Sequence, residues 1–216
     1  MCLHILRMKD TLPELKIQIT EELILEVIRI SRLAGDAIME VYKTDFDIQI
    51  KDDLSPVTEA DKRANLIIEN GLMALDNSIP ILSEEGREIT YEERREWETL
   101  WVVDPLDGTK DFIKINGEFT VNIAYIENHV PIFGVVYAPA KDSLYWGSLG
   151  NGAWKQEAHN PAQAMTVASQ IDETVQIATS RSHPSEKLNT FLAQFKDYEL
   201  HPIGSSLKIC LVSDGS

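Results

Sequence analysis

The spacing of apolar residues predicts helices in the first third of the chain. Apolar side chains recur every three or four positions over residues 20–43 and again over residues 58–75, which predicts two amphipathic helices. Thr20 and Thr58 are suited to cap these helices at their first turns. Residues 1–19 carry no such period, and we expect them to form a loosely attached N-terminal extension.

The rest of the chain is richer in strand patterns. Alternation over residues 46–50 predicts a half-buried strand, and short apolar runs broken by turn residues over 120–155 predict an antiparallel meander. The elements expected after the meander are a strand, a helix and a last helix, at 175–179, 188–195 and 204–212. This order predicts a layered α/β or α+β fold, with a first half at 20–160 and a second half at 161–216.

Composition narrows the function classes. The net charge of −15 argues against nucleic-acid binding, which needs a basic surface, and would repel a phosphorylated substrate unless bound cations reverse the local field. Two cysteines, Cys2 and Cys210, offer no disulfide framework, so we expect a reducing, cytoplasmic setting, with Cys210 as a small buried apolar residue. No apolar run approaches the length of a membrane span.

Two apolar runs end abruptly in acidic residues. The run at 101–103 leads into Asp-Pro-Leu-Asp-Gly-Thr at 104–109, and the run at 79–82 leads into Ser-Glu-Glu-Gly at 83–86. Two buried strands that end in acids predict a cage of hard oxygen ligands of the kind that Mg²⁺ prefers. The candidate ligands are the carboxylates of Glu84, Asp104 and Asp107 and the carbonyl oxygen of Leu106.

Each of these motifs also has a purely structural interpretation. The stretch at 104–109 could be a turn that carries surface acids, although its place directly after an apolar strand favours metal binding. Thr58 and Asp61 have the spacing of a helix capping box, and periodicity alone favours that role. The functional alternative places Asp61 beside Thr109, where the pair would orient a water molecule.

Motifs near the C-terminus suggest anion binding. In Ser-Arg-Ser-His at 180–183, Arg181 could bind a second phosphate or stack on a base, and His183 could donate to phosphate or belong to a turn before a helix. Gly-Ser-Ser at 204–206 could bind an anion through its backbone amides, with Ser205 among them, or could simply cap a helix. Lys208 would add positive charge there unless it is solvated.

Taken together, these motifs resemble those of a known family. The stretches that carry the resemblance lie at 55–61, 82–85, 101–113, 116–124, 134–139, 180–183 and 204–208. They are similar to the motifs of the inositol monophosphatase superfamily and, within it, of the CysQ-type 3′(2′),5′-bisphosphate nucleotidases. The resemblance runs from about Glu21 to about Gly215 and implies a layered α/β sandwich that depends on two or more Mg²⁺ ions and is inhibited by lithium.

The resemblance also implies roles for individual residues. Asp61 and Thr109 match the pair that activates the attacking water. Glu85 would steady the metal ligands, or would itself be a ligand if the end of the strand is rotated. The ligands implied are those named above: Glu84, Asp104, Leu106 and Asp107. The implied contacts with substrate are Glu84, Leu106, Asp107, Gly108, Thr109, Arg181, His183, Ser205 and Lys208.

One block of the family pattern is missing from this sequence. A Trp-Asp pair that opens a later helix and supplies a metal ligand has no counterpart, and the sequence reaches its last residue before that block would begin. We therefore expect a C-terminally truncated fold with an incomplete second half. The chain could be a fragment, or a shortened product without full activity, or another carboxylate, from Asp214 or a partner chain, could complete the cage.

Three functional hypotheses follow. The first is a phosphatase that removes the 3′-phosphate of adenosine 3′,5′-bisphosphate, and of its sulfated form, by direct attack of a metal-activated water. The second keeps the fold and changes the substrate to inositol or another sugar phosphate, against which the motif at 180–183 argues. The third is a non-catalytic fragment that binds metal or nucleotide. The family implies a cytoplasmic location, at the inner face of the membrane for some members; the oligomeric state stays open.

Overall fold

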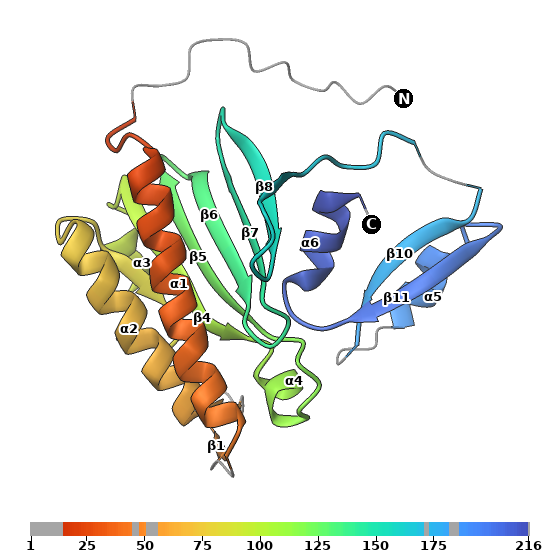
Figure 1. The fold of residues 1–216 in the computed structure, drawn as a ribbon, viewed down its shortest axis with the longest axis horizontal. Coiled ribbons are helices and arrows are strands. Elements are labelled where there is room, and N and C mark those ends of the chain that lie inside the picture. Colours follow the sequence, from red (N-terminus) through yellow and green to blue (C-terminus); the bar gives the residue numbers. More distant parts are fainter. Residues whose placement is uncertain (1–14, 45–47, 51–55, 171–172, 182–185, 216) are drawn as a thin grey trace.

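A seven-stranded mixed sheet, with the order β3-β4-β5-β6-β7-β8-β9, forms the centre of the molecule (Figure 1). The computed structural model describes residues 15–44, 48–50, 56–170, 173–181 and 186–215. The strands are β3 (Ile81–Ser83), β4 (Thr99–Asp107), β5 (Thr120–Glu127), β6 (Val130–Ala138), β7 (Ser143–Ser148), β8 (Gly152–Glu157) and β9 (Gln163–Ala164). The predicted meander is confirmed, because β5 to β8 pair in sequence order and antiparallel.

Two long helices lie side by side against one face of this sheet (Figure 1). Helix α1 (Glu21–Tyr42) begins after Thr20, whose hydroxyl accepts the Leu23 amide, and α2 (Glu59–Leu75) begins after Thr58. Both helices were predicted within a residue or two of these bounds, because their apolar stripes are continuous. The stripes pack on the inner face of the sheet around Trp101 and Tyr125, which are buried.

The segment that enters α1 is fixed to the sheet. The Lys16 amide donates to both carboxylate oxygens of Glu127, at 3.0 and 3.1 Å, and the Tyr125 hydroxyl donates to the same buried carboxylate. Leu15 and Ile17 pack against the core. The expectation of a loosely attached extension is therefore wrong for residues 15–19, because a buried acid at the end of β5 provides an anchor. Residues 1–14, including Cys2, lie outside the described residues.

The last part of the chain stands to one side of the large sheet, beyond β7 and β8 (Figure 1). Its elements are β10 (Val175–Ser180), α5 (Glu186–Leu192), β11 (Tyr198–Ile203) and α6 (Leu207–Asp214). Strands β10 and β11 pair in parallel, and α6 packs on the sheet through Leu207 and Cys210. Burial raises the pKa of the Cys210 thiol to about 12, which agrees with the predicted buried, apolar role.

Several short elements escaped prediction. They are β2 (Pro56–Thr58), α3 (Tyr91–Arg94), α4 (Thr109–Ile113), β9 and β11, whereas β1 (Ile48–Ile50) lies within the strand predicted at 46–50. Most of β11 is exposed and it carries Pro202, so it lacks the apolar alternation by which strands are recognised. Within the described residues, no helix combines the length and apolar character required to cross a bilayer.

Candidate active site

The acidic motifs meet because β3 and β4 are parallel neighbours. Ser83 at the end of β3 is paired with Val103 on β4, so both strands deliver their following residues to the same edge of the sheet. The Glu84 amide donates to the Val103 carbonyl at 3.1 Å, which extends the pairing by one residue. The predicted convergence of the two acidic motifs is thus a consequence of one parallel join in a largely antiparallel sheet.

The sequence suggested that strand β4 ends at its first carboxylate, but the strand is longer. It continues to Asp107, and its register with β5 shifts between Asp104 and Asp107. The Leu106 amide turns back to donate to Asp104 Oδ1 at 3.2 Å. An irregular strand that re-aims its side chains is a common device beside active sites.

The carboxylates at this edge are crowded. Burial raises the pKa of Asp104 from its ordinary 3.8 to about 8, and the charges of Glu84, Asp107 and Asp61 add to the rise. Asp104 is therefore close enough to three other acids for their charges to oppose its ionisation, in a place where burial is already unfavourable for charge. Such a group has excess negative charge that a bound cation would neutralise.

Asp61 makes the contacts that both interpretations of the sequence require. Its Oδ2 accepts from the amide and the hydroxyl of Thr58, at 2.7 and 2.6 Å, and so completes the capping box of α2. Its Oδ1 accepts from the Thr109 hydroxyl at 3.3 Å. Burial raises the pKa of Asp61, while the Thr58 hydrogen bonds oppose the rise and the charge of Glu85 adds to it. The cap therefore holds one oxygen and leaves the other directed at Thr109.

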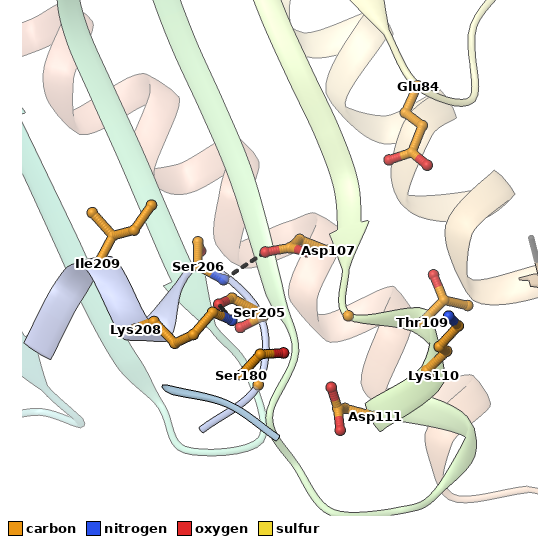
Figure 2. Close-up of a pocket in the computed structure, with 12 residues that line it drawn as sticks. Glu84, Asp107, Thr109, Lys110, Asp111, Ser180, Ser205, Ser206, Lys208 and Ile209 are labelled. Atoms are coloured by element: carbon orange, nitrogen blue, oxygen red, sulfur yellow. Dashed lines mark hydrogen bonds between the residues drawn. The ribbon is translucent and has the colours of Figure 1, made fainter. Parts of the chain in front are cut away.

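A cavity of about 400 Å³ opens beside these acids (Figure 2). It is lined by Glu84, Asp107, Gly108, Thr109, Lys110, Asp111, Ser180, Gly204, Ser205, Ser206, Lys208 and Ile209. Figure 2 shows Glu84 on one side and the loop before α6 on the other, with Asp107 between them and directed at Ser206. Gly108 turns the chain from β4 into α4 with φ of +93°, a conformation that glycine adopts without strain.

The structure gathers most of the predicted site residues here. Of those expected to contact substrate, Glu84, Asp107, Gly108, Thr109, Ser205 and Lys208 line the cavity. Asp61, Asp104 and Leu106 stand outside the lining, although the Leu106 carbonyl lies 3.3 Å from the Thr109 hydroxyl. Arg181 is directed to Glu118 instead, with Nε to Oε2 at 2.7 Å. His183 lies outside the described residues.

The donor chemistry fits a hard divalent cation, but the ligand shell is open. Within the described part of the chain, no three Asp, Glu, His or Cys side chains converge closely enough to hold an ion as they stand. Asp107 Oδ2 accepts the Ser206 amide at 2.5 Å (Figure 2). Carboxylates and a carbonyl at one sheet edge, with mutual repulsion, are nevertheless the donors that Mg²⁺ requires.

Asp214 does not join the acids of this site. Its carboxylate, largely buried, accepts from Lys155 Nζ on β8 at 2.9 Å, and the same ammonium bonds Glu157. The suggestion that Asp214 could complete a metal cage is therefore wrong for this structure, because a buried ion pair engages it at the far end of α6.

Some cavity residues were not singled out from the sequence. Lys110 and Asp111 follow the acidic motif directly, and they reach the cavity because α4 begins at Thr109. Ser206 was part of a recognised motif, but its amide contact with Asp107 joins positions 99 residues apart. Glu118 lay within a family motif without an assigned role. No local pattern signals such long-range partners.

The fold is a layered α/β fold, and the site is a cluster of carboxylates at the edge of a sheet. Metal-dependent phosphatases use clusters of this kind. Comparison with known proteins agrees. The sequence matches the Inositol monophosphatase family over residues 20–216. This protein belongs to that family, as the motifs predicted.

Individual relatives extend the comparison. The chain is 43% identical to a protein of Buchnera aphidicola subsp. Acyrthosiphon pisum over 193 residues, covering 88% of this chain and 71% of that protein. It is 45% identical to one of Escherichia coli (strain K12) over 192 residues, covering 88% and 76%. Both are named 3′(2′),5′-bisphosphate nucleotidase CysQ. The predicted class of enzyme therefore agrees with the names of these relatives.

A solved structure confirms the predicted fold class. The crystal structure of CysQ from Bacteroides thetaiotaomicron, described as a bacterial member of the inositol monophosphatase family, superposes with a TM-score of 0.77. It is 37% identical in sequence, and the match covers 91% of this chain and 78% of that one.

Proposed function

We propose that this protein is an Mg²⁺-dependent phosphatase that removes the 3′-phosphate of adenosine 3′,5′-bisphosphate, with the sulfated form of that nucleotide as a second substrate. The observation that carries the proposal is the Asp61–Thr109 pair, set beside the crowded acids at the mouth of a cavity with a serine-rich wall. The names of the CysQ relatives support the choice of substrate.

The acids at the sheet edge would hold the metal. Glu84, Asp104 and Asp107 would supply carboxylate oxygens, and Leu106 would supply its carbonyl. Mg²⁺, when bound, draws negative charge from the phosphate oxygens and acidifies water. Small side-chain movements are needed for this, and Asp107 can offer Oδ1 to the metal while Oδ2 still accepts the Ser206 amide.

The proton path is assigned to Thr109 and Asp61. Thr109 Oγ lies 3.3 Å from both Asp61 Oδ1 and the Leu106 carbonyl; when its one proton is directed to Asp61, its oxygen lone pairs are available to accept a proton from water. A water molecule held by Thr109 Oγ attacks phosphorus; its oxygen forms the new P–O bond as the ester P–O bond breaks. Its proton passes to Thr109 Oγ and on to Asp61, and the departing ribose oxygen takes a proton from solvent.

Two lysines of the cavity are suited to the rest of the nucleotide. Lys110 and Lys208 line the cavity and can offset the charge of a second phosphate. Backbone groups of Gly108 and Thr109 adjoin the acids where the reacting phosphate would lie. Lys110 lies beside Thr109 and Asp111, and Lys208 lies across the cavity beside Ser205, so each side of the cavity carries a lysine (Figure 2).

The test measures phosphate release from adenosine 3′,5′-bisphosphate with and without Mg²⁺, and compares it with release from inositol 1-phosphate. We expect Mg²⁺-dependent turnover that favours the nucleotide. Thr109→Ala should lower kcat by roughly 10²-fold or more, since it removes the proton acceptor. The exposed Thr174–Asp197 pair has the same 3.3 Å separation, so Thr174→Ala is a matched control that should leave turnover unchanged. Folded protein without Mg²⁺-dependent release would refute the proposal.

A further inference from the structure

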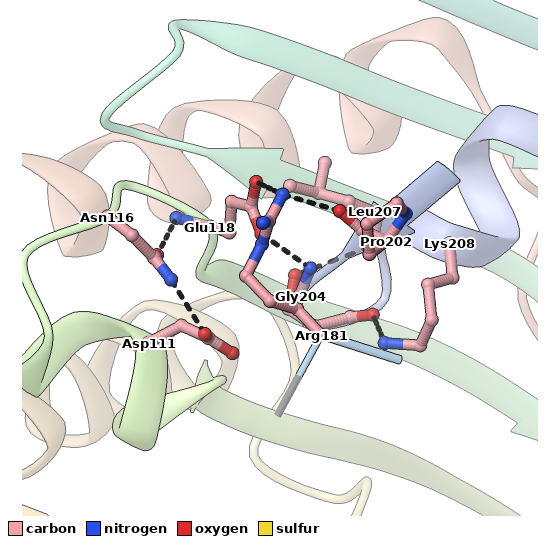
Figure 3. Close-up of polar contacts among 9 residues, drawn as sticks. Asp111, Asn116, Glu118, Arg181, Pro202, Gly204, Leu207 and Lys208 are labelled. Atoms are coloured by element: carbon pink, nitrogen blue, oxygen red, sulfur yellow. Dashed lines mark hydrogen bonds and ion pairs between the residues drawn. The ribbon is translucent and has the colours of Figure 1, made fainter. Parts of the chain in front are cut away.

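A charged contact joins the two halves of the molecule beside the cavity (Figure 3). Arg181, which follows β10, donates from Nε to Glu118 Oε2 at 2.7 Å and from Nη2 to Oε1 at 2.9 Å. The Glu118 side chain is 11% exposed and that of Arg181 is 44% exposed. A two-pronged arginine–carboxylate pair of this kind fixes direction as well as distance.

The same carboxylate holds the loop before α6. The Gly204 amide donates to Glu118 Oε2 at 2.8 Å (Figure 3). We call Glu118, Arg181 and Gly204 the Glu118 bridge. Gly204 has little space around it, because a Cβ at this position would lie 2.7 Å from Asp111 Oδ2 and 2.8 Å from the Glu118 carbonyl oxygen. The loop is therefore pressed against the segment between α4 and β5.

The acidic partner is itself held in place. The Asn116 side chain donates to Asp111 Oδ1 at 2.7 Å and accepts the Glu118 amide at 2.9 Å, so it links α4 to the residue that carries the bridge (Figure 3). Glu118 and Asp111 are both buried, and the charge of Arg181 acts on both of them. The guanidinium of Arg181 is therefore already paired with protein carboxylates, and a ligand would have to compete with them for it.

The Glu118 bridge is connected to the candidate metal site by two further residues of the chain. After Gly204 the chain passes through Ser205, whose φ is +51°, and the Ser206 amide donates to Asp107 Oδ2. The Ser206 hydroxyl is fixed in turn, 3.0 Å from Asn122 Oδ1. A shift of Gly204 would therefore move the amide that orients Asp107.

We propose that Glu118 is a positioning residue of the site: through Gly204 it sets the loop that lines the cavity and orients Asp107, with Arg181 as its counter-ion. The role of Arg181 then differs from the phosphate contact expected from the sequence. The contacts of the Glu118 bridge are observed in the structure, whereas its effect on metal and nucleotide affinity rests on the proposed function.

The first experiment uses Glu118→Gln, which keeps the shape of the side chain but turns an NH₂ group toward donors of the bridge. Glu127→Gln is the matched control, because Glu127 is also a buried acid that accepts three hydrogen bonds, at the other end of β5. Amide NMR should show displaced Gly204 and Ser206 signals in Glu118→Gln and unmoved ones in Glu127→Gln. Unchanged Gly204 and Ser206 signals in folded Glu118→Gln would overturn the proposal.

The second measurement concerns binding. Mn²⁺ affinity, followed by electron paramagnetic resonance, should weaken by about 10-fold in Glu118→Gln, as is usual when a residue that orients a metal ligand is lost. The Glu127→Gln control should stay within about 2-fold of the native protein. A native protein that binds no Mn²⁺ would refute the proposed function and leave the NMR test of the bridge in force.

The third variant separates positioning from direct contact. If Arg181 acts through Glu118, Arg181→Gln should weaken adenosine 3′-monophosphate and adenosine 3′,5′-bisphosphate by the same factor, and the double variant should lose no more than either single one. If Arg181 binds the second phosphate, only the bisphosphate should weaken, which would overturn its assignment as a counter-ion. Because Arg181 is nearly half exposed, this variant also provides the test if Glu118→Gln does not fold.

Discussion

Replacing Asp104 by asparagine should stabilise the metal-free protein while it abolishes Mg²⁺ binding. Burial first, then the charges of Glu84, Asp107 and Asp61, raise the Asp104 pKa from 3.8 to about 8. That rise of about four corresponds to roughly 5 kcal/mol at 1.36 kcal/mol per pKa unit. The side chain keeps partial contact with solvent and the neighbouring acids can relax, so we expect about 2 kcal/mol.

The direction of the Asp104 pKa shift determines the pH range over which the stability of the protein changes. Because the folded-state pKa of Asp104 is raised, its contribution to stability is fully present below pH 3.8 and is lost as pH rises toward about 8. In EDTA the native protein should therefore lose stability between pH 5 and pH 9, and Asp104→Asn should lose less. At pH 9 the variant should melt roughly 4–8 °C above the native protein, since 1 kcal/mol shifts Tm by about 2–4 °C at this size.

The assay is thermal unfolding in EDTA at both pH values, repeated with Mg²⁺. Glu88→Gln, at an exposed position, is the control for the simple loss of one negative charge. Added Mg²⁺ should raise the Tm of the native protein and leave that of Asp104→Asn unchanged. A variant no more stable than the native protein at pH 9, or one whose advantage does not shrink at pH 5, would contradict the argument from burial and charge.

Two further predictions concern packing and charge. Gly204→Ala should lower stability by about 1–3 kcal/mol, because its Cβ would lie 2.7 Å from Asp111 Oδ2, whereas Gly134→Ala meets only an ordinary 3.7 Å contact; urea unfolding of both variants checks this. Lys155→Ala should cost about 1–3 kcal/mol by removing the lysine from largely buried Asp214, yet leave nucleotide affinity unchanged, which calorimetry would detect.

The parts of the molecule that could be predicted are those determined by neighbouring residues. The acids at 84 and 104–107 were found because each follows an apolar strand and precedes a glycine turn. The capping box at Thr58 was equally visible, since its members are three residues apart. Their convergence was predicted from their common position after two strands, and the parallel pairing of β3 and β4 is how the structure achieves it.

What could not be predicted depends on distant partners. The guanidinium of Arg181 is well suited to bind phosphate. No neighbouring residue in the sequence shows that it instead donates two hydrogen bonds to Glu118, 63 residues earlier. The docking of residues 15–19 likewise depends on Glu127, which is more than a hundred residues away. A buried carboxylate that takes hydrogen bonds from distant segments is the physical reason for both contacts, and burial becomes known only once the sheet has formed.

The site is assembled from segments that are far apart in the chain, and this bears on the order in which the protein folds and fails. Thr109 and Asp61 are 48 residues apart, and Ser206 and Asp107 are 99 apart, whereas β5 to β8 join successive neighbours. Loop closure delays such distant contacts, so the meander can form early and the catalytic edge late. The same edge should open first under mild denaturant, and a population with intact sheet and no activity should appear before global unfolding.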